Sequence, residues 1–372
     1  MAHGDPHLRD GAKQLYFNRH TRMYLDMTPA LAHPIEILVV VTPHFNLATT
    51  SAFLDPFRAA NYLTGQSRFK WSLISYSGGA VATSNGMTVA TAALSTTTGS
   101  PPDIVVVSSS WSPERYQEAA LTKQLQRWAR AGTRAETRAR TRIGALDTGG
   151  FILAKAGLLD GKRATVHYEH IDAFIELFPE IDVSETVFVV DGPVFTCCGG
   201  MASMDLALHL LQELGGEGLA NAAARYLFHH AVRGPDASQN PDRLEPFGQT
   251  TPSLVRRAID VMEAHLETPL SIPAICQHLK VSQRHLGRVF KDYVRKTPVL
   301  YYRDIRLDRA RGLVTQTELK LSEIAVASGF ASQVHFSRAY HQRFGLSPRQ
   351  DRIDGRVPFE FRAWPMHTPK GR

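Results

Sequence analysis

Two stretches in the last third of the chain, Leu270–Val294 (LSIPAICQHLKVSQRHLGRVFKDYV) and Leu321–Gly345 (LSEIAVASGFASQVHFSRAYHQRFG), repeat one helical pattern. Each contains a short helix with an apolar stripe, then a tight turn, then a second helix that starts at a serine. Serine is a favoured N-cap because its hydroxyl accepts a hydrogen bond from an otherwise unpaired backbone N–H of the first turn. The pattern predicts two helix-turn-helix units in tandem.

The polar face of the second helix is the expected binding surface of each unit. We expect Ser282 and Ser332 to cap these helices, and Ser322 to cap the first helix of the second unit. Arg and Gln side chains suit guanine and adenine edges in a major groove, so these faces predict contact with double-stranded DNA. The candidate DNA-binding residues are Gln283, Arg284, His285, Arg288, Ser332, Gln333, His335 and Arg338.

The stretch between the two units, Thr297–Gln316, is predicted to be a long amphipathic helix that holds them at a fixed separation. It carries four arginines, which suit two different roles. They can contact DNA phosphates, or they can form ion pairs within the domain, and the sequence leaves both readings open. The arginines are Arg303, Arg306, Arg309 and Arg311.

Charge is distributed unevenly along the chain. Residues 250–372 contain 21 Lys and Arg against 11 Asp and Glu, whereas the preceding residues contain 21 against 24. A basic module joined to a mildly acidic one fits a polyanionic partner such as DNA. A basic surface that serves only solubility is the simpler alternative, and charge alone does not decide between the two.

The front of the chain follows a different plan. From Ile35 onward, short runs rich in β-branched residues, such as IEILVVV (Ile35–Val41) and DIVVVSS (Asp103–Ser109), alternate with helical stretches. Near-continuous apolar strands separated by helices predict an α/β domain, a flavodoxin-like, mostly parallel sheet with helices on both faces. Strand patterns stop after Pro252, which predicts an all-α domain at the carboxyl end with the two helix-turn-helix units.

These patterns predict five segments. They are a partly disordered tail (1–34), an α/β domain (35–232), a polar linker rich in Pro and Gly (233–251), the helical domain (252–349) and a second tail (350–372).

Several classes of protein are disfavoured. The three cysteines, Cys197, Cys198 and Cys276, are too few and too unevenly spaced for a disulfide framework or a zinc site. The longest apolar run, Ile37–Val41, is far shorter than a membrane span, and the first residues lack the apolar core of a signal peptide. We therefore expect a cytoplasmic protein without metal, cofactor or membrane partner.

Residues 252–349 resemble the DNA-binding domain of the AraC/XylS family of regulators. The most specific words are IRLDRARGLV, from Ile305, and LSEIAVASGFASQVHFSRAYHQRFGLSP, from Leu321. The resemblance implies that the two recognition helices enter successive major grooves on one face of the duplex, and that RNA polymerase is a partner. Two positions depart from the family: Cys276 stands where alanine is usual, and Arg295 stands where glycine usually ends a helix.

Residues 35–232 resemble the class I glutamine-amidotransferase-like (PfpI-like) domain of GlxA-type members of that family. The matching words are FNLATTSAFLDPFRAAN, ALDTGGFILAKAGLLDGKRATVHYEH and TCCGGMASMDLALHLL. Enzymes of this fold hold a cysteine nucleophile on a strained strand-to-helix elbow, supported by a downstream histidine. Here the elbow position holds Asp147, while His167 remains. The resemblance therefore implies a domain that is not an enzyme, and Cys197 with Cys198 fits a core position better than a nucleophile.

An elbow without a nucleophile can still bind a ligand, because open α/β sheets hold ligands at the carboxyl ends of their strands. A carboxylate flanked by aromatic rings suits a small cationic or zwitterionic amine or amino-acid-type metabolite. The resemblance agrees, since similar regulators are associated with arginine, choline, glycine betaine and carnitine metabolism, and it implies a homodimer and an activator. The candidate ligand-binding residues are Phe45, Trp111, Asp147, Thr148, His167 and Glu169.

Each of these residues also has a purely structural interpretation. Asp147 can cap the following helix, His167 can be a structural histidine, Trp111 can belong to the core, and Glu169 suits a helix start. Two classes of function therefore stay open: a ligand-responsive regulator, and an amidotransferase-fold enzyme with a DNA-binding tail. The basic segment Thr133–Thr141 (TRAETRART) is expected to be a solvated loop without an assigned function.

Overall fold

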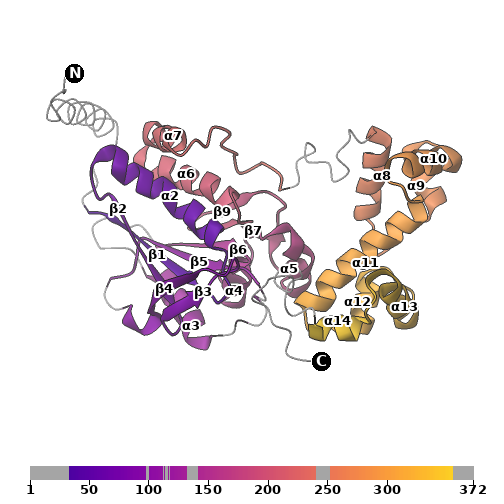
Figure 1. Cartoon of the computed structure of the whole chain (residues 1–372), viewed down its shortest axis with the longest axis horizontal. Helices are drawn as coiled ribbons and strands as arrows, with labels where there is room; N and C mark the ends of the chain where they lie inside the picture. The colour runs from indigo at the N-terminus through magenta and orange to yellow at the C-terminus, as the bar shows by residue number, and fades with distance from the viewer. Residues whose placement is uncertain are drawn as a thin grey trace, which may run out of the picture. The chain divides into compact units, whose positions relative to one another are not determined.

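A computed structural model describes residues 33–97, 100–111, 113, 116, 118–131, 141–239 and 252–354. The predicted tail before residue 33, residues 133–140 of the basic segment, residues 240–251 and residues 355–372 lie outside this description. The described residues fall into two compact units. Residues 33–171 and 178–239 make the front unit, and residues 252–354 belong, with 172–177, to the second (Figure 1).

The front unit is built on one mixed sheet with the strand order β3-β4-β2-β1-β5-β6-β10-β9. All neighbouring strands from β4 to β10 are parallel, and the edge strands β3 and β9 are antiparallel to their neighbours. This confirms the predicted α/β, mostly parallel fold. The strands are β1 (Ile35–Val41), β2 (Phe69–Ser75), β3 (Gly79–Ala82), β4 (Thr88–Ala93), β5 (Ile104–Ser109), β6 (Arg142–Asp147), β9 (Phe188–Asp191) and β10 (Val194–Cys197); β7 (Arg163–Ala164) and β8 (Asp182–Val183) form a separate pair.

Helices cover both faces of this sheet (Figure 1). On one face lie α2, α6 and α7, and on the other lie α3 and α4. The helices of the front unit are α2 (Leu47–Thr64), α3 (Ala119–Arg130), α4 (Gly149–Lys155), α6 (Ala202–Gly215) and α7 (Glu217–Tyr226), with short 3-10 turns η1 (Leu94–Thr96) and η3 (Tyr168–His170). Helix α5 (Ile171–Leu177) follows η3, and all but its first residue are grouped with the second unit. Strand β1 is therefore apolar along almost its whole length, because both of its faces are covered.

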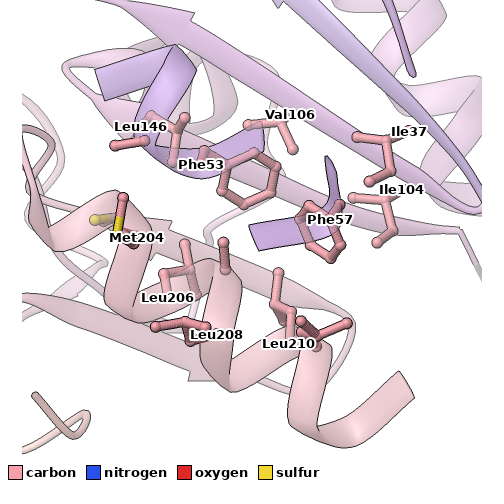
Figure 2. Packing of buried hydrophobic residues seen from close by; sticks show 14 of the residues in the cluster. Ile37, Phe53, Phe57, Ile104, Val106, Leu146, Met204, Leu206, Leu208 and Leu210 are labelled. Carbon is pink, nitrogen blue, oxygen red and sulfur yellow. The ribbon is translucent and has the colours of Figure 1, made fainter. Parts of the chain in front are cut away.

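The largest core lies between the sheet and helices α2 and α6 (Figure 2). Phe53 and Phe57 project from α2 toward the strand residues Ile37 and Val106, and Leu206 of α6 lies on their other side. Phe53 also stacks on Phe195 of β10, with ring centroids 6.3 Å apart. Each fully buried side chain of this size contributes about 1.5–3 kcal/mol. This core fixes the carboxyl ends of the strands.

The second unit is entirely helical. Its helices are α8 (Ser253–Glu263), α9 (Ile272–Leu279), α10 (Gln283–Tyr293), α11 (Pro298–Gln316), α12 (Leu321–Ala327), α13 (Gln333–Phe344) and α14 (Pro348–Asp354). Two separate apolar cores lie along it: α8, α9 and α10 enclose the first, and α12 and α13 enclose the second. Helix α11 supplies Tyr302 to the first core and Leu307 and Leu313 to the second. The predicted tandem arrangement is confirmed, with α11 as the shared helix (Figure 1).

One predicted N-cap is wrong. Helix α12 begins at Leu321, so Ser322 lies inside its first turn and Lys320 occupies the N-cap position. The backbone N–H of Lys320 donates to the Glu323 carboxylate at 2.7 Å. A side chain inside the helix thus accepts from the N-cap backbone, as in the reciprocal half of a capping box. Ser282 and Ser332, in contrast, cap α10 and α13 as the sequence predicts.

The segment ends also differ from the predicted boundaries. The first seven residues of the predicted linker belong to the front unit, where Arg233 pairs with the buried Asp205 at 2.7 Å and Gln239 donates to the Val166 carbonyl at 3.0 Å. At the other end, α14 crosses the boundary placed at residue 349, and Asp351 is fully buried. Across the described ranges no helix is both long enough and apolar enough to span a membrane.

Candidate nucleic-acid interface and ligand site

The recognition helices α10 and α13 are built alike. The Ser282 hydroxyl accepts from the His285 N–H at 3.2 Å, and the Ser332 hydroxyl accepts from the His335 N–H at 3.3 Å. Each helix then turns two large side chains into its core, all of them fully buried: Leu286 and Phe290 in α10, Phe336 and Tyr340 in α13. Since these inward residues fix the rotation of each helix, they also decide which residues face out.

All eight candidate DNA-binding residues are exposed, and in each unit they gather on the start of the second helix. Within α10 the Arg288 guanidinium lies 3.3 Å from His285 Nδ1, so two of these side chains touch. The exposed residues are Gln283, Arg284, His285, Arg288, Ser332, Gln333, His335 and Arg338. A long polar face free of core contacts is what entry into a groove requires.

The turn of the second helix-turn-helix unit contacts the first helix-turn-helix unit directly. Lys280 and Gly329 occupy equivalent positions with φ of 57° and 71°. A Cβ at Gly329 would lie 2.5 Å from the Leu266 carbonyl oxygen, so only glycine permits the second turn to sit this close to the loop after α8. The Arg306 guanidinium donates to the Gly329 carbonyl at 2.7 Å. The two helix-turn-helix units therefore pack directly against each other, in addition to sharing α11.

For three of the four α11 arginines, contacts within the helical unit support the internal interpretation over the phosphate interpretation. Arg311 contacts the buried Asp351 at 2.8 Å, and Arg303 lies 3.9 Å from Asp304. Arg306 packs over the Phe330 ring, 4.8 Å from its centroid, and burial lowers the pKa of its guanidinium. These three side chains stabilise the helical unit internally.

In the front unit, β6 ends in a sharp elbow at Asp147. Asp147 has a φ of 60°, in the left-handed region, and α4 starts two residues later. A Cβ at Gly149 would lie 2.3 Å from the Val107 carbonyl oxygen, so glycine is needed where α4 turns back over β5. Thr148, which is fully buried, occupies the N-cap position of α4, and its hydroxyl donates to the Ser110 carbonyl. Asp147 itself is therefore not the helix cap.

The Asp147 carboxylate is buried, with 5% of the residue exposed. Asn46 Nδ2 donates to Oδ2 at 3.4 Å. Burial raises the pKa of Asp147 to about 7, the nearby Glu169 charge adds to the rise, and hydrogen bonds from Asn46 and Ser110 oppose it. Within the described residues, no Lys, Arg or His side chain lies within ion-pair distance of this carboxylate.

His167 and Glu169 lie beside the elbow. The His167 backbone N–H donates to the Asp147 carbonyl at 3.4 Å, and the Glu169 N–H donates to His167 Nδ1 at 3.4 Å. Burial lowers the pKa of His167, so its imidazole is neutral at physiological pH, and the 3.9 Å approach of the Glu169 carboxylate carries little weight. Glu169 stands in the first turn of η3, the position that the structural interpretation gave it.

The aromatic part of the predicted site needs one correction. Phe45 is fully buried in the apolar core, because the residue after the β1 turn points inward under α2. Its neighbour His44 takes the outer position and stacks on the half-buried Trp111, with centroids 5.9 Å apart. The structure also adds Asn46 and Ser110. Asn46 carries a visible sequence signal as the N-cap of α2, whereas Ser110 carries none.

The cysteine pair lies behind the elbow. Cys197 is buried, and its sulfur accepts from the Gly199 N–H at 3.4 Å. The contact with Cys197, together with burial, raises the pKa of the Cys198 thiol far above its usual range. A Cβ at Gly199 would lie 2.9 Å from Asp147 Cβ, so this turn abuts the elbow directly. The Cys198 thiol is therefore held in its neutral form, and Cys197 is buried behind the elbow.

Comparison with known proteins finds the same two halves. Residues 36–213 match the DJ-1/PfpI family, and residues 275–353 match a helix-turn-helix domain. The HTH-type transcriptional regulator CdhR of Pseudomonas aeruginosa is 35% identical over 314 residues, which cover 84% of this chain and 90% of that protein. The HTH-type transcriptional regulator GlxA of Rhizobium meliloti is 35% identical, over 82% of this chain and 91% of that protein.

Fold, exposed recognition helices and relatives together define an HTH-type transcriptional regulator. The chain belongs to the family of AraC-type regulators that carry a DJ-1/PfpI domain in front of the helix-turn-helix domain.

Proposed function

We propose that this chain is a ligand-responsive transcription activator. The helical domain reads double-stranded DNA, and the front domain responds to a small cationic or zwitterionic metabolite. The protein works as a homodimer and recruits RNA polymerase. The observation that carries the DNA half is the matched exposed face of α10 and α13. The observation that carries the ligand half is a buried carboxylate held by neutral groups at the carboxyl ends of the strands.

The DNA half is tested by truncating one matched arginine in each unit. For an arginine that contacts a base, Arg288→Ala or Arg338→Ala should weaken DNA binding by about 1–3 kcal/mol and relax specificity at one base pair. Footprints should cover two major grooves about one helical turn apart. With about five phosphates neutralised, log K should fall with log salt at a slope of roughly −4 to −5. A footprint confined to one groove contradicts the tandem readout.

The ligand half rests on the charge of Asp147. A cation beside this carboxylate gains a charge-assisted hydrogen bond in a site with little competing water. The His44–Trp111 stack supplies an aromatic wall near the same edge, which suits a cation–π contact. Because the pKa of Asp147 is raised to about 7, the ionised fraction grows between pH 6 and pH 8. Affinity for a cationic ligand should therefore rise over this range.

A thermal-shift screen of the full chain against amines, amino acids and betaines should identify the ligand. A ligand at a hundredfold excess over its Kd adds about 2.7 kcal/mol of stability. Asp147→Asn keeps the shape and removes the charge, so it should weaken the ligand by about 1.5–3 kcal/mol and abolish activation while DNA binding stays intact. The control is Asp55→Asn on the surface of α2, where Arg58 is its exposed partner. A full inducer response in Asp147→Asn contradicts this site.

The amidotransferase-type enzyme is the second candidate, and the geometry favours it less. It needs a thiolate, whereas Cys198 is held as a neutral thiol and Cys197 is buried. Labelling of the folded chain with iodoacetamide at pH 7 should leave both cysteines unmodified. Rapid modification of either would favour the enzyme.

A further inference from the structure

The recognition helices can be compared position by position. Ser282–Phe290 reads SQRHLGRVF and Ser332–Tyr340 reads SQVHFSRAY. Exposed and buried positions follow the same order in both, so the two segments present equivalent faces. Four of the five exposed positions carry the same residue type: serine, glutamine, histidine and arginine. The third exposed position alone differs, with Arg284 in α10 and Val334 in α13.

Val334 is an unusual residue for this face. It is 66% exposed, in the first turn of α13, between the exposed Gln333 and His335. A single exposed valine needs no explanation on an ordinary surface. Here its neighbours and its counterpart Arg284 place it on the face that enters the groove, where an apolar group meets water or a base edge.

We propose that Val334 reads the C5-methyl group of a thymine in the groove entered by α13, and that Arg284 reads a guanine at the equivalent position of the other groove. This rests on the proposed DNA function of both helices. The thymine methyl is the apolar group that a standard base pair offers in the major groove, whereas guanine N7 and O6 accept from a guanidinium. The two half-sites therefore differ at this one position, although the other exposed residues match.

The test uses the full chain and a duplex selected by it from a random-sequence library. Each thymine of the selected site is replaced in turn by deoxyuridine, which pairs identically but lacks the methyl group. One thymine in the groove of α13 should weaken binding of the wild-type chain about fourfold, which corresponds to about 0.8 kcal/mol for one buried methyl-sized group.

Three variants isolate the side chain. Val334→Ala should bind the thymine and uracil duplexes with nearly equal Kd, because the contact is already lost. Val326→Ala is the matched control, since Val326 is 63% exposed on α12, and it should keep the wild-type fourfold difference. Val334→Arg should shift the selected base at that position from thymine to guanine, as at Arg284.

The outcomes separate this proposal from the wider function. If the full chain selects no sequence, the proposed DNA function fails. If it selects one but no thymine is methyl-sensitive, or Val334→Ala keeps the full sensitivity, the assignment of Val334 fails alone. If Val334→Ala loses activation in a reporter strain with unchanged DNA preference, the valine contacts a protein and the assignment is likewise wrong.

Discussion

Two carboxylates buried in different halves of the molecule have opposite surroundings. Asp351, in α14, receives the Arg311 guanidinium at 2.8 Å and the Tyr340 hydroxyl at 2.8 Å. Asp147, at the elbow, has an amide donor at 3.4 Å and no cation in the described surroundings. A buried charge that is fully paired belongs to the scaffold. A buried carboxylate held only by neutral donors can still bind a cation. Burial alone therefore does not distinguish a structural carboxylate from a ligand-binding one.

The difference is not one between the two domains. Asp205 lies in the front unit and is fully buried, yet His229 Nε2 contacts it at 2.7 Å and Arg233 Nε donates to it at 2.8 Å. Its surroundings therefore resemble those of Asp351 and not those of Asp147, although Asp147 belongs to the same unit.

The largest effect is expected where the pairing is complete. Asp351→Ala leaves Arg311 and the Tyr340 hydroxyl without their acceptor, and breaking a buried pair in this way costs about 3–5 kcal/mol. Hydrogen exchange of α13 peptides in increasing urea measures the loss within the full chain. Asp308→Ala is the control, because its carboxylate is 52% exposed beside Arg343, and it should cost less than about 1 kcal/mol. Equal losses in the two variants would remove the contrast.

At Asp147, removal of the carboxylate charge should stabilise the protein instead of destabilising it. Its pKa is raised from 3.8 to about 7 in the folded protein, so the folded state holds a proton that the unfolded chain releases between these values. The contribution of Asp147 to the stability of the front unit should therefore be greatest below pH 4, fall as the pH rises to 7, and level off above it.

Asp147→Asn lacks this dependence, so it should match the wild type near pH 4 and exceed it at pH 8 by up to about 4 kcal/mol. Urea unfolding at several pH values, followed by exchange of β6 peptides, checks both the sign and the window. A destabilised Asp147→Asn at pH 8 would mean that the carboxylate is paired after all.

The smallest effect on stability is expected at Arg295, which shares the left-handed backbone conformation of Asp147 but not its burial. Arg295 has a φ of 59°, almost the value of Asp147, but it is exposed. Arg295→Gly should stabilise the first helix-turn-helix unit by about 0.5–1 kcal/mol, because relief of the left-handed conformation exceeds the added freedom of the unfolded chain. Lys291→Gly, inside α10, should lose a similar amount. Two variants with the same sign would show that strain at Arg295 is negligible.

What the sequence predicts well is local and periodic. The apolar spacing of α10 and α13, with serine caps, foretells both the inward and the exposed residues, since neighbours three and four positions apart share a helix face. The alternation of apolar runs and helices likewise foretells the parallel sheet.

What it predicts poorly depends on contacts between distant segments. Asn46 and Asp147 are 101 positions apart, so no spacing links them. Phe45 and His44 are adjacent at a strand end, and only the packing of α2 decides which of them enters the core. The boundary at residue 349 fails for the same reason: α14 is a polar heptapeptide whose place depends on Arg311, 40 positions earlier.

Helix α11 has a consequence for the operator. Its 19 residues span about 28 Å at 1.5 Å per residue, close to the 34–36 Å of one DNA turn. Because it is one continuous helix and Gly329 packs on the loop after α8, the described residues 252–354 contain no flexible connection between the two helix-turn-helix units that could follow a change in half-site spacing. One inserted base pair rotates the second half-site by about 35° around the duplex axis. If both helix-turn-helix units read the duplex as proposed, the DNA must then bend or untwist to restore both contacts, and the spacer length should be tightly constrained.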